Sequence, residues 1–145
     1  MQKQCHPDVR DYGKEPFVFN INHAANMNPN FRTTLWTGEY LQLTLMSIPV
    51  GGDIGVEMHS DVDQFIRVES GRALVKIGKN CRLEDGEKCV DSNYAIIIPA
   101  GTWHNVINLG YSPLKLYSIY APPHHAFSTV HPTKLDAQRD EDDKK

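Results

Sequence analysis

Short runs of strand-forming residues, separated by turn residues, constrain this chain more than any other feature of its sequence. Runs of β-branched, aromatic and leucine residues recur at close spacing, and Gly, Pro, Asn and Asp fill the gaps between them. No amphipathic helical pattern interrupts the series, which argues against parallel βαβ units. The pattern therefore predicts an all-β domain, an antiparallel sandwich or barrel. The expected strands cover residues 33–37, 40–48, 54–58, 64–69, 72–77, 94–98, 104–108 and 114–120.

The segments on either side of these strands differ in composition. The chain divides into an irregular N-terminal arm, a β domain and a short charged C-terminal tail, over residues 1–32, 33–121 and 122–145. Within the arm we expect a short strand at residues 17–19 and at most a short turn of helix, capped by asparagine, within residues 22–30. Within the tail we expect a short helix that begins at Lys134 with Thr133 as its cap.

Composition and charge exclude several classes of protein. The 145 residues suffice for one domain. Lys and Arg number 15 against 18 Asp and Glu, and no basic block is present, so a nucleic-acid site is not expected. The longest apolar run, residues 94–98, is far shorter than the roughly 20 residues of a membrane helix. With no apolar leader and an odd count of three cysteines, we expect a cytoplasmic protein with reduced thiols.

The first segment that carries chemistry runs from residue 51 to residue 71. Glu57 and His59 are two residues apart on an expected strand, so both side chains leave the same face. The next residues expected to face inward, again spaced by two, are Gln64, Ile66 and Val68. Arg67 and Glu69 alternate with them and are expected to point to water.

The second segment reads Pro99-Ala-Gly101-Thr-Trp-His104-Asn-Val-Ile-Asn108 and fits the pattern Pro-x-Gly-x2-His-x3-Asn. With this pattern the chain resembles the cupin family, small β-barrels of the jelly-roll type, over roughly residues 40–121. The family has Gly where this chain has Asn93, and Asn tolerates the left-handed backbone that Gly serves. The likeness implies a small cupin β-barrel, or double-stranded β-helix.

The resemblance also implies a metal site. Family cupins bind a divalent ion with three His and one Glu, and the matching positions here are Glu57, His59, Gln64 and His104. The single carboxylate has in effect moved from the third ligand position to the first. Glu57, His59 and His104 form a 2-His-1-carboxylate set, which suits iron(II) with open positions. We expect one divalent ion, with iron, zinc, nickel and manganese all open. Gln64 would be a fourth ligand, a neighbour of the ligands or a substrate contact.

The chain is most similar to small single-domain cupins often labelled mannose-6-phosphate isomerase-like. The resemblance implies a metal-dependent enzyme, an isomerase or a dioxygenase, acting on a small polar metabolite such as a sugar or sugar phosphate. In an isomerase, a carboxylate would move the proton: Glu57, if it is not a metal ligand, or Asp63. The alternative is a non-catalytic module that binds a metabolite, which the neutral Gln64 favours. Related cupins commonly pair through strand exchange, which implies a homodimer with residues 33–37 or the N-terminal strand exchanged.

Two further groups of residues are weaker candidates. His124, His125 and His131 follow the last main strand, and a solvated loop or a subunit contact is the better interpretation than a second metal site. Cys81 and Cys89 flank Glu84-Asp-Gly86, which fits a hairpin loop and would place the two thiols opposite each other. Two unremarkable thiols are nevertheless a better interpretation than a redox switch.

Overall fold

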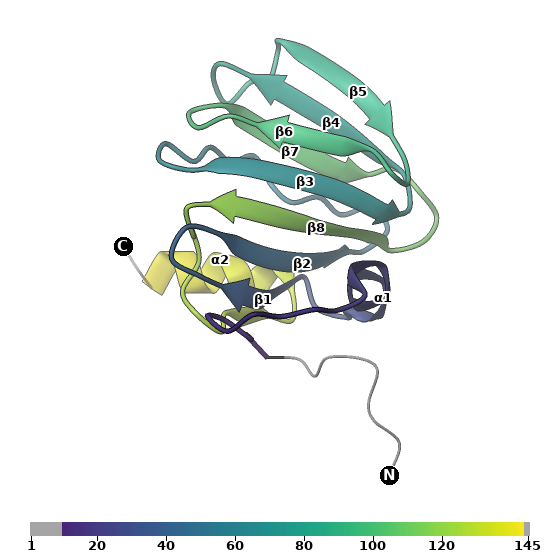
Figure 1. Ribbon diagram of the computed structural model, residues 1–145. Coiled ribbons are helices and arrows are strands. Elements are labelled where there is room, and N and C mark those ends of the chain that lie inside the picture. The colour runs from purple at the N-terminus through teal and green to yellow at the C-terminus, as the bar shows by residue number, and fades with distance from the viewer. Residues whose placement is uncertain (1–9, 144–145) are drawn as a thin grey trace.

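The computed structural model describes residues 10–143, which form two antiparallel β-sheets packed face to face (Figure 1). The larger sheet has the strand order β6-β3-β8-β2-β1-β9, and the smaller sheet has the order β5-β4-β7. The strands are β1 (Arg32–Thr37), β2 (Gln42–Ile48), β3 (Asp63–Ser70), β4 (Ala73–Gly78), β5 (Gly86–Val90), β6 (Ala95–Ile98), β7 (Trp103–Asn108), β8 (Leu114–Ala121) and β9 (Val130–His131). This architecture confirms the predicted all-β barrel.

Alternation along the strands builds the core between the two sheets. On β3, Gln64, Ile66 and Val68 are all buried, as the spacing of two predicts. Ile66 and Val68 join apolar side chains from both sheets in one cluster. Glu69, however, is not in water as expected: it is buried, its carboxylate lies 3.1 Å from the Arg67 guanidinium, and it accepts a hydrogen bond from Asn22. The sequence pattern could not show this, because Asn22 belongs to a helix outside the sheet.

Strand register gathers polar side chains at one end of the barrel. Tyr120 on β8 lies opposite Gln42 on one neighbouring strand and opposite Gln64 on the other. All three side chains are at most 2% exposed. Toward the other end of the same strands, Leu116 lies opposite Met46 and Val68, so the interior there is apolar. The polar end is therefore where the barrel can carry chemistry.

Several local expectations are corrected by the structure. Residues 17–19 form no strand. The strand expected at residues 54–58 does not form either, and this part of the chain makes only isolated bridges, at Asp53 and Glu57. Strands β5 and β9 were not expected. Cys89 lies on β5 opposite Leu74, and Cys81 lies in the loop before that strand, so the two cysteines do not face each other in a hairpin. Both are exposed free thiols.

The two helices form where capping residues predict them. Helix α1 (Ile21–Met27) begins after Asn20, whose side chain accepts a hydrogen bond from the His23 amide. Helix α2 (Lys134–Asp143) begins after Thr133, whose hydroxyl accepts from the Asp136 amide while the Asp136 carboxylate accepts from the Thr133 amide. Neither helix, within the described part of the chain, is long and apolar enough to cross a membrane.

Strand β1, expected as an element exchanged between subunits, is paired on both sides within the chain. Its partners are β2 on one side and β9 on the other. This pairing gives no support to exchange of residues 33–37, and the homodimer stays a prediction.

Candidate metal centre

An extended segment, residues 53–57, carries Glu57 along the edge of β7. The Glu57 amide donates to the His104 carbonyl at 3.0 Å, and the His104 amide donates to the Glu57 carbonyl at 2.9 Å. Asn105 secures the segment, because its side-chain oxygen accepts from the Gly55 amide and its nitrogen donates to the Asp53 carboxylate. Residues directly opposite in an antiparallel pair point their side chains to the same face. The pairing therefore fixes Glu57 beside His104.

Three ligand-type atoms converge at this point. The Glu57 Oε1 atom lies 3.3 Å from His104 Nε2 and 3.4 Å from His59 Nε2. Within residues 10–143, Glu57, His59 and His104 form the one group of His, Cys, Asp and Glu side chains whose ligand atoms lie close enough together to hold a metal ion. The predicted carboxylate and both predicted histidines are therefore brought together.

Backbone contacts orient the His104 imidazole and hold the His59 backbone in place. His104 Nδ1 lies 3.0 Å from the Thr102 carbonyl, which can only accept, so Nδ1 carries the proton and Nε2 faces Glu57 with its lone pair when the ring is neutral. The Gly101 amide donates to the His59 carbonyl at 2.7 Å and ties the two motifs together. Gly101 has φ +83°, a conformation that favours glycine, and Asn93 has φ +75°, the left-handed backbone expected for it.

The electrostatics of the group keep Glu57 ionised. Burial would raise the pKa of Glu57, but the contacts with His104 and His59 outweigh it and hold that pKa well below its usual range. Burial would likewise lower the pKa of His104, but the Glu57 carboxylate and the Thr102 carbonyl outweigh it and raise that pKa above 6.5. A carboxylate is thus ready to bind a cation at neutral pH, and a proton competes for His104.

Gln64 and Asp63 lie on opposite faces of β3. Gln64 is 2% exposed, its amide nitrogen donates to the Ser118 hydroxyl at 3.1 Å, and its amide oxygen has no hydrogen-bond partner. Asp63 is exposed, and its carboxylate accepts from the Ala100 amide at 2.9 Å. The structure therefore keeps the inward Gln64 as a ligand candidate. It does not bring Asp63 to the group, because neighbouring residues on a strand point to opposite faces.

The donor set fits a divalent ion. Glu57 Oε1, His59 Nε2 and His104 Nε2 are all buried atoms without a hydrogen-bond partner, which is costly unless another group binds them. Two ligands that each lie about 2.1 Å from an ion, at a tetrahedral angle, are about 3.4 Å apart, close to the two separations observed. These three residues can therefore hold a metal ion.

Comparison with known protein families agrees with this geometry. The model of the family described as "Cupin domain" matches residues 44–120, more than half of the chain and nearly all of its paired strands. This chain is a cupin.

The relatives of this cupin do not extend the assignment to an activity. The uncharacterized protein YrkC of Bacillus subtilis is 58% identical over 134 residues, which cover 92% of this chain and 72% of YrkC. An uncharacterized mimivirus protein from Acanthamoeba polyphaga mimivirus is 39% identical over 124 residues, 85% of this chain and 72% of the viral protein. The crystal structure of BH2720 from Bacillus halodurans has a TM-score of 0.89 and 56% identity, and covers 90% of this chain and 99% of its own. The likeness to mannose-6-phosphate isomerase-like cupins finds no support in these comparisons.

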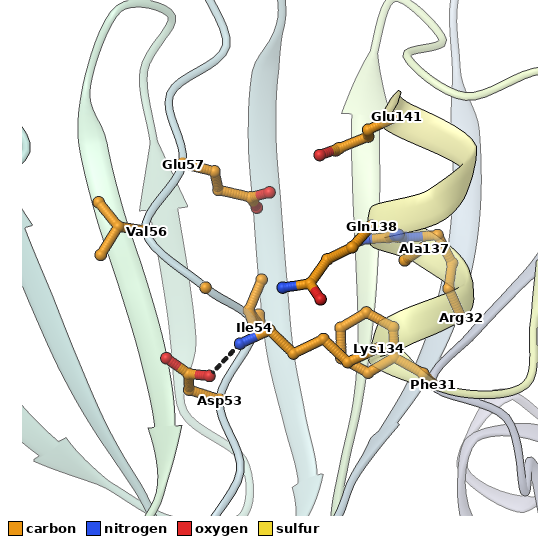
Figure 2. Close-up of a pocket in the computed structure, with 11 residues that line it drawn as sticks. Phe31, Arg32, Asp53, Ile54, Val56, Glu57, Lys134, Ala137, Gln138 and Glu141 are labelled. Carbon is orange, nitrogen blue, oxygen red and sulfur yellow. Dashed lines mark hydrogen bonds and ion pairs between the residues drawn. The ribbon is translucent and has the colours of Figure 1, made fainter. Parts of the chain in front are cut away.

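A cavity of about 350 Å³ opens beside Glu57 in this cupin. Figure 2 shows one of its walls, where Lys134, Gln138 and Glu141 project from α2 toward the segment that carries Glu57 and Asp53. Lys134 donates to the Asp53 carboxylate and so ties the helix to that segment. Burial would raise the pKa of Asp53, but hydrogen bonds from Lys134 and Asn105 outweigh it and lower that pKa. The predicted charged tail is thus a wall of the site, which its strongly polar sequence did not indicate.

His124 and His125 also lie close to the group, in a loop that is solvated as expected, because His124 is exposed and His125 half-buried. The His124 ring packs on His59, with ring centroids 4.1 Å apart, and His125 contacts Tyr120 at 5.2 Å. Gln42 holds this turn, because its side-chain oxygen accepts from both His124 and His125 amides. These histidines line the approach to His59, and the second metal site considered from the sequence is not formed by the described residues. The contact with Gln42, which lies 82 and 83 residues earlier in the chain, is not carried by any local pattern in the sequence.

Proposed function

We propose that this cupin binds one divalent metal ion through Glu57, His59 and His104, with Gln64 as a fourth ligand, and acts as a metal-dependent enzyme on a small polar metabolite. The observation that carries the proposal is the convergence of three buried, unbonded ligand atoms, one of them on Glu57, which also lines a cavity. Three or four protein ligands leave coordination positions open to a substrate. The cavity is large enough for a small metabolite.

The chain's own residues set the conditions for catalysis. A bound metal would supply Lewis acidity or, if it is iron, activation of oxygen. Gln138 on α2 offers an amide to substrate hydroxyl groups, and Lys134 holds the Asp53 wall in place. An isomerase also needs a carboxylate that moves a proton; Asp63 lies outside the cavity, whereas Glu141 faces it from α2 (Figure 2). We therefore assign that role, in an isomerase, to Glu141, because Glu57 is occupied as a metal ligand.

Metal content measured by plasma mass spectrometry on tag-free protein tests the proposal. We expect one ion per chain in the wild type. In His104→Ala, which removes one ligand, we expect the metal occupancy to be at least about tenfold lower. His23→Ala, on α1 and outside the group, is the control and should keep the ion. Iron would direct the next assays to oxygen consumption, and zinc, nickel or manganese to sugar isomerisation. A wild type that stays metal-free after incubation with each of these ions overturns the proposal.

Metal binding is expected to weaken as pH falls through the pKa of His104, which lies above 6.5 in the metal-free protein. A proton on Nε2 competes directly with the ion, whereas Glu57 stays ionised throughout this range. Below that pKa, each further fall of one pH unit should lower the apparent affinity for the ion about tenfold for each proton that the ion displaces. Competition titration with a metal indicator between about pH 5.5 and 8.5 measures the effect. An affinity that does not change over this range would contradict the assignment of His104 as a ligand.

A second candidate function is a non-catalytic module that binds a metabolite. Gln64 favours it, because a neutral amide stands where the family has a charged ligand. Such a module should bind its ligand when the metal is absent. A metal-dependent enzyme should not turn over its substrate without the metal. Ligand screening by thermal shift, on protein with and without metal, compares the two functions.

A further inference from the structure

Arg32 is a buried cation in the wall of the same cavity. The residue is 5% exposed, begins β1 and lines the cavity together with Glu57. Among the residues that the structure describes, no carboxylate lies within ion-pair distance of its guanidinium, and its Nε atom has no hydrogen-bond partner. A buried charge is costly unless an opposite charge or hydrogen bonds compensate it. Arg32 therefore lacks an anionic partner among the described residues.

The contacts of Arg32 orient the side chain without neutralising it. Its Nη1 atom lies 3.2 Å from His131 Nδ1, and because a guanidinium can only donate, Nδ1 must accept. His131 Nε2 then carries the proton and donates to Asp140 at 2.9 Å. A neutral imidazole thus stands between the guanidinium and the carboxylate. The Nη2 group of Arg32 has no hydrogen-bond partner among the described residues, and Arg32 is one of the residues that line the cavity (Figure 2).

Charge balance in the cavity favours an anion with a single negative charge. The lining carries two positive side chains, Arg32 and Lys134, and three negative ones, Asp53, Glu57 and Glu141. The net charge of the lining side chains is therefore −1 without a metal and +1 with a divalent ion on Glu57. A carboxylate, with one charge, neutralises the loaded cavity. A phosphate dianion would leave an excess negative charge beside Glu141.

We propose that Arg32 anchors the carboxylate of a small organic acid in this cavity, with the other polar atoms of that acid facing Glu57 and the metal position. This inference rests on the proposed metal site, because the bound ion changes the net charge of the cavity lining from −1 to +1. Arg32 can bind a carboxylate through two parallel N–H···O bonds, which a lysine cannot do. The substrate class is thereby narrowed from polar metabolites in general to small carboxylic acids.

Isothermal titration calorimetry with glycolate, lactate and 3-hydroxypropanoate, each against its neutral amide, tests this anchor. We expect metal-loaded wild type to bind at least one of these monocarboxylates and none of the amides. Arg32→Gln should weaken that binding by at least about tenfold, and Arg32→Lys by less, because charge-assisted bidentate bonds are lost in stages. Arg139→Gln, an exposed arginine of α2 outside the cavity lining, is the matched control and should bind like the wild type. Inorganic phosphate should bind more weakly than the preferred monocarboxylate.

The outcomes separate this inference from the metal site. Metal-loaded protein that binds no monocarboxylate, binds the amides equally well, prefers phosphate, or binds unchanged in Arg32→Gln overturns the carboxylate anchor and leaves the metal site standing. Protein that takes up no metal but binds a monocarboxylate through Arg32 keeps the anchor and overturns the metal site. If Arg32→Gln fails to fold by circular dichroism, Arg32→Lys and the comparison of carboxylates with their amides in the wild type decide.

Discussion

Replacing Glu57 by Gln is expected to lower the affinity for a divalent ion by about a hundredfold or more. Glu57 is the only anionic member of the group, and its Oε1 atom contacts both imidazoles. The substitution keeps the size of the side chain but removes the negative charge, so a divalent ion would meet neutral ligands alone. The loss should exceed that from removing one neutral imidazole. Competition titration of the purified variant with a metal indicator measures it.

The control for this substitution is Glu87→Gln, an exposed position on β5 that removes one carboxylate elsewhere. It should bind the ion as the wild type does. Glu57→Gln also separates the two candidate functions, since an enzyme should lose turnover together with its metal, whereas a metal-free binding module should keep its ligand. A variant that holds the ion with wild-type affinity would show that Glu57 is not a ligand.

Local patterns in the sequence were sufficient to predict the parts of the site that lie on or beside paired strands. Spacing of two placed Glu57 and His59 together and turned Gln64 inward, since alternation is a property of the strand itself. Capping residues located the start of α2 at Lys134. In each case the residues that decide the structure are close together in the chain.

The remaining parts depend on contacts between distant segments, which no local pattern carries. His124 lies against His59 because Gln42, 82 residues earlier, binds the backbone of its turn. Arg32 lies in the cavity because β9 and α2 return to β1 at the end of the chain. No local pattern in the sequence distinguishes Arg32 from the other arginines. Its burial and its lack of an anionic partner among the described residues became evident only in three dimensions.

Asn108, the last residue of the motif that contains His104, has a structural role that its spacing alone did not reveal. Its side-chain nitrogen lies within hydrogen-bond distance of the Ile48, Pro49 and Ser112 carbonyls, at 3.0, 3.2 and 3.0 Å. Its side-chain oxygen accepts from the Gly110 amide at 2.8 Å. One buried amide thus joins the end of β2 to the turn between β7 and β8.

Replacing Asn108 by Ala is expected to lower the free energy of unfolding by about 2–4 kcal/mol, because buried backbone groups lose their partners. Asn108→Asp should be at least as damaging, since it keeps the acceptor for Gly110 but sets a carboxylate oxygen against several carbonyl oxygens. Asn26→Ala, which removes one exposed hydrogen bond on α1, is the control. Urea unfolding followed by circular dichroism measures the three variants. Since Asn108 lies at the opposite end of β7 from His104, folded Asn108→Ala protein should still bind metal like the wild type. Loss of metal without loss of stability would contradict a structural role and place Asn108 in the site.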